Sequence, residues 1–248
     1  MSNEPQTPIR RFVEDYRRLR FAEGYASSDP AFARQLPFRD TTGRNVAAWR
    51  LRALHYVVIR TGLALLPAVD RVLDVGAGNG WLARRLAHRY SVTALDVDAT
   101  DAGLGAIDDP RIRRVRGDLE ALPVRDGTFD VVIAAAALHY AVNLSRALAE
   151  MARALRPGGV LVIADSPFYG DALARHRAWR RTLGYYEEAG AAHLARRYQG
   201  LTRAELDGPA LFRFITLSPG YEPLRAALAH LRGRETGPRL PVIFGWKR

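Results

Sequence analysis

The chain has 248 residues, which is enough for one well-packed domain with an appendage and short for two full domains. Its hydrophobic content of 48% and charged content of 25% are typical of globular proteins. The longest apolar run, Val131 to Leu138, is far shorter than the roughly 18 residues of a membrane span. The first residues lack the apolar core of a secretion signal, so we expect an unexported, cytoplasmic protein. The absence of cysteine excludes disulfides, thiolate metal sites and cysteine nucleophiles.

The formal net charge of +11 is the kind of excess that nucleic-acid-binding proteins carry. Its composition weakens that interpretation, because lysine occurs once, at Lys247, and arginine supplies every other positive side chain. The arginines are also dispersed in short groups along the whole chain. This distribution favours a solvated arginine-rich surface over a nucleic-acid-binding patch.

The first 66 residues predict helices and no strand. Residues 10–20 and 45–66 both place apolar side chains at helical spacing, and Pro67 ends the second segment. A turn-rich loop joins them through Gly24, Pro30 and Gly43. We therefore expect residues 1–66 to form a helical extension or lid, and residues 67–248 to form the main domain.

From Arg71 onward, short apolar runs alternate with helical patterns. Strands are expected at residues 72–75, 92–96, 112–116, 129–134 and 160–165, and two more at 211–217 and 242–246. Helices are expected after the first strand, over 144–155 with Asn143 as its cap, through the region from 165 to about 200, and near 224–231. The segment 99–107 is a weaker helical candidate. This alternation predicts an α/β fold with a doubly wound, seven-stranded and mostly parallel sheet.

The stretch from Arg71 to Tyr90 predicts a ligand-binding turn. A buried strand is followed by a turn with Gly76, Gly78 and Gly80 at alternate positions, and then by a helix. Glycines without a Cβ can adopt positive φ and let a ligand lie directly on the backbone. Free N–H groups at the start of the following helix favour a carboxylate or a phosphate.

The glycine spacing differs from that of dinucleotide-binding proteins. A G-x-G-x-x-G fingerprint counted from Gly76 requires a third glycine at position 81, where the chain has Trp81. Alternate glycines preceded by Asp74 instead resemble the first motif of the class I S-adenosylmethionine-dependent methyltransferases. A nicotinamide-dependent oxidoreductase, the nearest alternative by fold, fits this spacing less well.

Further segments in the family's order strengthen the resemblance. They are the strand ending at Asp96, the loop 116–123, the start of the fourth strand at 126–132, the turn 155–161 and the closing segment 241–246. The resemblance covers residues 71 to about 166 and extends more loosely over the remainder. It is greatest to the small-molecule branch that includes ubiquinone-type and natural-product methyltransferases. Residues 1–66 resemble no family motif.

The resemblance implies S-adenosyl-L-methionine as cofactor and a role for each motif residue. The three glycines would support the cofactor, and Asp74 would lie near its methionine end. Asp96, with Val97 after it, would accept hydrogen bonds from the ribose hydroxyls. Asp118 and Leu119 would contact the adenine. Each residue also has a structural alternative, in which the glycines form a tight turn and the aspartates cap a turn or end a strand, and Asp98 is a second candidate carboxylate.

His139 is the candidate general base. It follows the fourth predicted strand, at the edge where open α/β sheets bind ligands, and a neutral imidazole there could accept a proton from an acceptor hydroxyl. Packing and cofactor contact are alternative roles for it. Tyr140, Tyr169, Tyr185 and Tyr186 are candidates for an acceptor pocket, and Tyr25 for a residue that closes over the cofactor. No histidine pair beside a carboxylate has metal-ligand spacing, so no metal is expected.

The sequence therefore predicts a methyltransferase that acts on a small-molecule acceptor. Two alternatives stay open, a nucleic-acid methyltransferase and a catalytically silent cofactor-binding subunit. Two observations disfavour a nucleic-acid methyltransferase. The sequence has no Asn/Asp-Pro-Pro-aromatic motif, typical of amino-directed enzymes, after the fourth strand, and it has no cysteine for methylation at the C5 atom of a pyrimidine. The sequence does not define the acceptor, the methylated atom or the oligomeric state.

Overall fold

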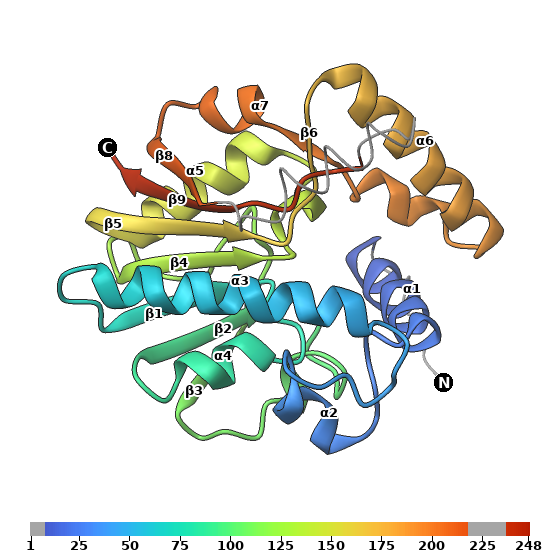
Figure 1. The fold of residues 1–248 in the computed structure, drawn as a ribbon, viewed down its shortest axis with the longest axis horizontal. Helices are drawn as coiled ribbons and strands as arrows, with labels where there is room; N and C mark the ends of the chain where they lie inside the picture. The colour runs from blue at the N-terminus through green and yellow to red at the C-terminus, as the bar shows by residue number, and fades with distance from the viewer. Residues whose placement is uncertain (1–7, 218–236) are drawn as a thin grey trace.

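A seven-stranded sheet forms the centre of the molecule in the computed structural model, which describes residues 8–217 and 237–248 (Figure 1). The strand order is β3-β2-β1-β4-β5-β9-β8. β1 to β5 pair in parallel, and β9 is antiparallel to both β5 and β8. The strands are β1 (Arg71–Val75), β2 (Ser91–Asp96), β3 (Ile112–Arg116), β4 (Phe129–Ala135), β5 (Leu155–Ala164), β8 (Phe212–Leu217) and β9 (Val242–Lys247).

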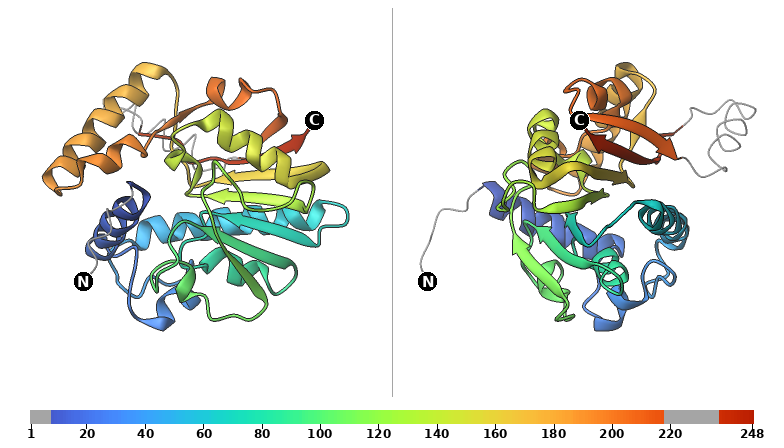
Figure 2. Two further views of the ribbon diagram at one scale, coloured as in Figure 1. Left: turned by 180° about the vertical axis from the view of Figure 1, so that it is seen from behind. Right: turned by 90° about the vertical axis from the view of Figure 1, so that its left-hand side faces the viewer.

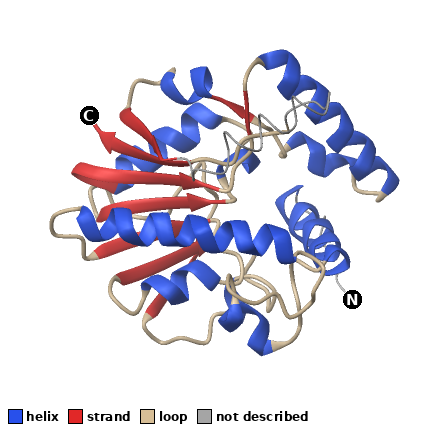
Figure 3. Cartoon of the chain, viewed as in Figure 1, coloured by secondary structure: helices blue, strands red, loops and turns tan. Residues whose placement is uncertain are grey.

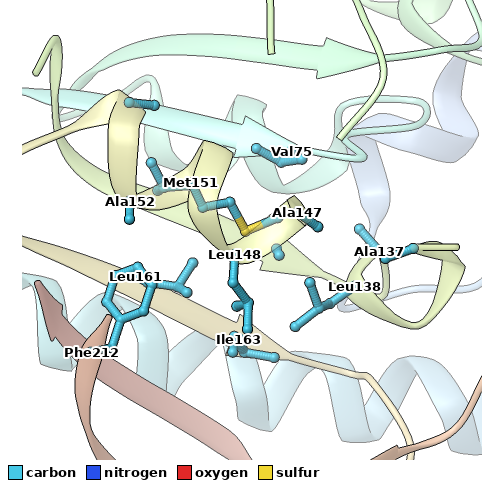
Figure 4. Packing of buried hydrophobic residues seen from close by; sticks show 14 of the residues in the cluster. Val75, Ala137, Leu138, Ala147, Leu148, Met151, Ala152, Leu161, Ile163 and Phe212 are labelled. Atoms are coloured by element: carbon cyan, nitrogen blue, oxygen red, sulfur yellow. The ribbon is translucent and has the colours of Figure 1, made fainter. Parts of the chain in front are cut away.

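Helices cover both faces of the sheet, because the central strands are apolar on both sides. Successive strand residues alternate between two cores, so that Leu73 belongs to one and Val72 to the other. The first core contains α5 (Leu144–Ala154) and α7 (Arg203–Asp207), and Figure 4 shows Met151 of α5 directed toward Ala147 and Leu148. The second core contains α3 (Val46–Leu65) and α4 (Trp81–Leu86). The two helical layers lie on opposite sides of the sheet in Figure 2.

The N-terminal segment consists of α1 (Pro8–Glu23), α2 (Pro30–Gln35) and α3. α3 packs so closely on the sheet that a Cβ added at Gly62 would lie 2.3 Å from the Phe244 ring. α1 lies at the carboxyl ends of the parallel strands, across from α6 (Ala172–Glu188) (Figure 3). No helix within residues 8–217 and 237–248 is long and apolar enough to cross a bilayer.

Local sequence signals explain several element boundaries. The Asn143 side chain accepts a hydrogen bond from the Arg146 N–H and begins α5, as predicted. A capping box of Thr202 and Glu205 begins α7, directly after the short strand β7 (Leu201–Thr202). β7 pairs with β6 (Phe168–Tyr169) in a separate two-stranded sheet.

The predicted fold class is confirmed, and most element boundaries agree within two residues. Four details were wrong. The loop after Gly24 contains α2, capped by Asp29, and β5 begins at Leu155 because that residue pairs with Phe129 across an irregular register. Segment 99–107 forms one 3-10 turn, η1 (Leu104–Ala106), because Gly103 and Gly105 let the chain fold back on residues 98–100.

The fourth difference concerns the region after Asp165, where one long helical segment was predicted. β6 precedes α6, and Gly190, with φ of 67°, separates α6 from the 3-10 helix η3 (Ala192–Arg196). A left-handed glycine at this position ends a helix, so the helical pattern is divided in two. The remaining 3-10 helix, η2 (Leu138–Tyr140), follows β4. The helix predicted near residues 224–231 lies outside the described residues.

Candidate active site

The glycine turn after β1 combines two packed positions with one open position. Gly76, Gly78 and Gly80 have φ of 72°, 51° and 72°, a region that side chains other than glycine rarely adopt. A Cβ at Gly76 would lie 2.4 Å from the Ala137 Cβ, and one at Gly80 would lie 2.5 Å from Ile107. No described atom lies within 4 Å of the Cβ position at Gly78. The turn therefore leaves free space directly above the Gly78 backbone.

Asp96 faces this turn from the carboxyl end of β2. Its Oδ2 accepts a hydrogen bond of 2.8 Å from the Gly78 N–H, and its Oδ1 accepts one of 2.8 Å from the Asp98 N–H. Burial raises the pKa of Asp96 to about 6, and the backbone hydrogen bonds limit the rise. The β2 carboxylate and the glycine turn are thus joined directly.

Asp74 lies in β1, two residues before the turn. Its side chain is 1% exposed, and its Oδ2 has no hydrogen-bond partner among the described residues. Burial, followed by the charge of Asp96, raises the pKa of Asp74 to about 7. Asp74 lines neither of the two cavities described below.

A cavity of about 620 Å³, partly open to solvent, brings together five of the predicted cofactor residues. α1 contributes Phe12 and Tyr16 to its wall, and Arg197 approaches Asp118 with an N–O distance of 3.6 Å. The predicted residues that line this cavity are Gly76, Asp96, Val97, Asp118 and Leu119.

A second cavity of about 700 Å³ shares Tyr16, Gly76 and Ala136 with the first. It extends over the glycine turn to the N-terminal helices, and it is lined by Gly78 together with aromatic and arginine side chains of α1 and α3. These side chains are missing from the sequence prediction, because no motif covers residues 1–66. Trp49 and Arg52 are three residues apart on a predicted helix and therefore lie on the same face of it. This spacing was the sequence feature that could have grouped them.

His139 lies in η2, directly after β4. Its side chain is 5% exposed, and its Nδ1 lies 3.1 Å from the Ser166 Oγ. Burial, with smaller effects from the charges of Arg20 and Arg52, lowers the pKa of His139 to about 3, so the imidazole is neutral at neutral pH. Its ring centroid is 4.3 Å from that of Tyr140, which lines the first cavity.

The tyrosines predicted to line an acceptor pocket or to close over the cofactor lie in different parts of the structure. Tyr140 lines the first cavity and Tyr25 the second. Tyr169 lines a different cavity beside α6, Tyr185 is exposed and hydrogen-bonded to Glu23, and Tyr186 packs in the cluster that joins α1 to η3. Within the described part of the chain, no group of three or more His, Asp or Glu side chains is placed to hold a metal ion.

The fold and this site define a class of protein. A parallel sheet that reverses order between β1 and β4, a glycine turn after β1 and a carboxylate at the end of β2 are the features of a Rossmann-like nucleotide-binding domain. The single antiparallel strand β9, inserted between β5 and β8, is the arrangement expected for the class I methyltransferase fold.

Comparison with known proteins agrees with this class. A family model described as a methyltransferase domain matches residues 73–163. The chain is similar to a malonyl-[acyl-carrier protein] O-methyltransferase of Pectobacterium atrosepticum, at 30% identity over 176 residues, which are 69% of this chain and 62% of that protein. A demethylmenaquinone methyltransferase of Renibacterium salmoninarum is 40% identical over 101 residues, covering 39% of this chain and 41% of the relative.

The solved structures share the fold. A geranyl diphosphate methyltransferase in complex with SAM has a TM-score of 0.58 and 19% identity, covering 87% of this chain and 94% of that one. The fold and these similarities support a class I S-adenosylmethionine-dependent methyltransferase domain. It spans less than two thirds of the curated relatives described above, with 62% and 41% of their lengths.

Proposed function

We propose that this protein transfers a methyl group from S-adenosylmethionine to a small-molecule acceptor. The observation that carries the proposal is the free space above Gly78, beside a carboxylate that is hydrogen-bonded to the same turn. A bound molecule can lie against bare backbone there while Asp96 accepts hydrogen bonds from its hydroxyls.

The residues around the two cavities fit the three parts of the cofactor. Asp96 would hold the ribose, and Asp118 with Leu119 would contact the adenine in the first cavity. The backbone from Gly76 to Gly78 would support the methionine portion, which extends toward the second cavity. Asp74, two residues before Gly76, would lie near the methionine portion from its buried position in β1.

The cofactor supplies an activated methyl group on a sulfonium, so the protein mainly has to orient the reactants and exclude water. We assign the second task to residues 1–66, which act as a lid on the domain formed by residues 67–248. The aromatic side chains of α1 support this assignment, because Phe12 and Tyr16 form walls of the first cavity. Their rings also stack, with centroids 5.5 Å apart.

His139 would accept a proton from the acceptor where the acceptor has to lose one. The Ser166 hydroxyl lies 3.1 Å from the ring and orients it. With a pKa of about 3 the imidazole is neutral but weakly basic, so this role requires that the bound acceptor raise the pKa of His139 toward neutral. His139 itself does not line the first cavity, whereas Tyr140, whose ring centroid is 4.3 Å from that of His139, does. An acceptor that loses no proton would leave His139 with a packing role alone.

The names of the relatives support a small-molecule acceptor. They include methyltransferases named for demethylmenaquinone and 27-O-demethylrifamycin SV, and one named for a malonyl group on an acyl carrier protein. A nucleic-acid acceptor has no such support from these names.

Calorimetric titration with S-adenosylmethionine, followed by methyl transfer from labelled cofactor to pooled metabolites, tests the proposal. We expect saturable binding at one site per chain and label in a small molecule. Folded protein that gives no binding signal with the cofactor, while it binds NADH, would instead indicate an oxidoreductase. Label recovered in added RNA or DNA would replace the small-molecule acceptor by a nucleic acid. Binding without any transfer would indicate the silent subunit.

A further inference from the structure

The outer face of α3 is largely apolar, although it is turned to solvent. α3 packs on the sheet through Tyr56, Ile59 and Leu63, and no other described helix lies outside it in Figure 1. On the opposite face, the side chain of Leu54 is 51% exposed and that of Leu65 is 80% exposed. A surface helix is usually polar on its outer side, so this face, which we call the α3 ridge, lacks a partner. The exposed residues of the α3 ridge are Val46, Ala47, Arg50, Leu54, Val57, Arg60, Thr61, Ala64 and Leu65.

The apolar surface continues beside the helix. The Phe38 side chain is 60% exposed, and its ring centroid lies 5.9 Å from that of Tyr56 in an edge-to-face arrangement. The Arg85 guanidinium carbon lies 5.1 Å from the centroid of the same ring. The ridge itself follows the 20 residues of α3, which correspond to a length of about 30 Å. The exposed side chains therefore form a strip along one helix and are not isolated surface residues.

All the charged side chains of α3 are positive. Residues 46–65 include Arg50, Arg52 and Arg60, and they contain no Asp or Glu. Arg50 and Arg60 are exposed on the ridge, and neither forms an ion pair with a carboxylate of the described residues. An arginine among exposed apolar side chains can bury its aliphatic stem while its guanidinium group reaches outward to anionic oxygen atoms. The ridge thus combines apolar side chains with cations that have no partner on the protein.

This combination fits the surface of an anionic bilayer better than a protein partner. α3 is a convex ridge, which a fluid surface can follow along its whole length. A second copy of this chain would bring the arginines of two ridges together without an acidic residue of α3 between them. At an anionic bilayer, the apolar side chains enter the boundary between headgroups and acyl chains, and the guanidinium groups bind phosphate oxygens.

We propose that the α3 ridge is a docking surface for an anionic phospholipid bilayer, on which α3 lies parallel to the membrane plane. Docking brings the lipid close to the candidate active site, because Trp49 and Arg52 in the first turns of the same helix line the second cavity. An acceptor dissolved in the bilayer would then have a short path to the site. The docking goes beyond the proposed function and does not depend on it, since it requires neither cofactor nor acceptor.

Two double variants of the ridge test the proposal by vesicle flotation without cofactor. Leu54→Gln with Val57→Gln removes apolar side chains from the middle of the ridge, and Arg50→Gln with Arg60→Gln removes its charge. The vesicles are made of phosphatidylcholine alone, or of phosphatidylcholine and phosphatidylglycerol in equal parts. Because all four positions are exposed, the variants should fold, and circular dichroism with thermal unfolding checks this.

Two matched controls carry the same changes at exposed positions away from α3. Val142→Gln with Leu173→Gln replaces side chains that are 54% and 62% exposed, as a control for the apolar pair. Arg180→Gln with Arg196→Gln lowers the net charge as much as the arginine pair of the ridge does. None of these four residues lines either cavity of the candidate site.

We expect the wild type to float with the mixed vesicles and much less with phosphatidylcholine alone. The apolar double variant should partition onto the mixed vesicles at least about tenfold more weakly, because the buried apolar area is lost. The arginine double variant should lose about fivefold for each arginine removed. Both control pairs should partition like the wild type.

Three outcomes would overturn the proposal. The first is wild-type protein that does not float, or that floats equally well with both kinds of vesicle. The second is a ridge variant that partitions as its matched control does, because the lipid would then bind elsewhere. The third is a wild-type dimer in sedimentation velocity that Leu54→Gln with Val57→Gln dissociates, because the ridge would then be covered by a second copy of the chain.

Discussion

Replacing Gly78 by alanine separates a binding role of the glycine turn from a structural one. The backbone at Gly78 has φ of 51°, so alanine there costs roughly 1–2 kcal/mol of stability from left-handed strain. The added methyl group meets no described atom within 4 Å, so no clash adds to this cost. For a chain of this size, the strain corresponds to a decrease in Tm of about 2–8 °C. The variant should therefore fold.

Binding should be affected far more than stability, because the new Cβ occupies the space where the cofactor would lie. We expect S-adenosylhomocysteine to bind Gly78→Ala at least about tenfold more weakly, as measured by calorimetry and by loss of the ligand-induced increase in Tm. Gly190→Ala is the matched control, because Gly190 has φ of 67° and also has no described atom within 4 Å of its Cβ position. It should lose similar stability and bind normally. Equal ligand affinity in the two variants would refute the assignment of Gly78 to the cofactor.

Three further substitutions test the carboxylates and the histidine. Asp96→Asn should weaken S-adenosylhomocysteine binding about tenfold or more at pH 8, and should abolish the decrease in affinity that we expect in the wild type below its pKa of about 6. Asp74→Asn should stabilise the fold at pH 8 by up to about 4 kcal/mol, since the native pKa of about 7 exceeds the value of 3.8 in an unfolded chain. This gain in stability should shrink as the pH falls below about 7, where native Asp74 takes up a proton. Urea unfolding at several pH values measures it, and a gain that does not change with pH would contradict a buried carboxyl group with a raised pKa. His139 has a native pKa of about 3, so between about pH 6.5 and pH 3 the unfolded chain binds a proton that the native state does not. Over this range its contribution should lower wild-type stability by roughly 1.4 kcal/mol per pH unit as the pH falls. His139→Gln should lack this component in urea unfolding, and an unchanged pH dependence would show that the imidazole is already solvated.

The central sheet could be predicted from the sequence because its strands are short, buried on both faces and bounded by clear turn signals. Val72, Leu73 and Val75 are fully buried, as their apolar run indicates. The glycine turn could also be predicted, because the spacing of Gly76 and Gly78 reflects a local backbone conformation. Neither depends on how distant parts of the chain approach one another.

A helical lid was predicted for residues 1–66, but most of the residues that it contributes to the site could not be predicted, because they depend on tertiary contact. Arg52 and Trp49 belong to a helix whose pattern shows which side is apolar, but not that its first turns lie above the glycine turn. The same limit applies to Asp74, whose sequence position next to the turn does not reveal that its carboxyl group is buried and lines neither cavity. Short elements such as α2, with six residues, leave too little periodicity to be recognised.

The most direct test of the account is a crystal structure of the protein with S-adenosylhomocysteine bound. We predict that the ribose hydroxyls lie within hydrogen-bonding distance of Asp96, that the adenine lies beside Asp118 and Leu119, and that the chain between sulfur and carboxylate crosses Gly78. A ligand bound elsewhere, or one whose ribose does not contact Asp96, would contradict the proposed site.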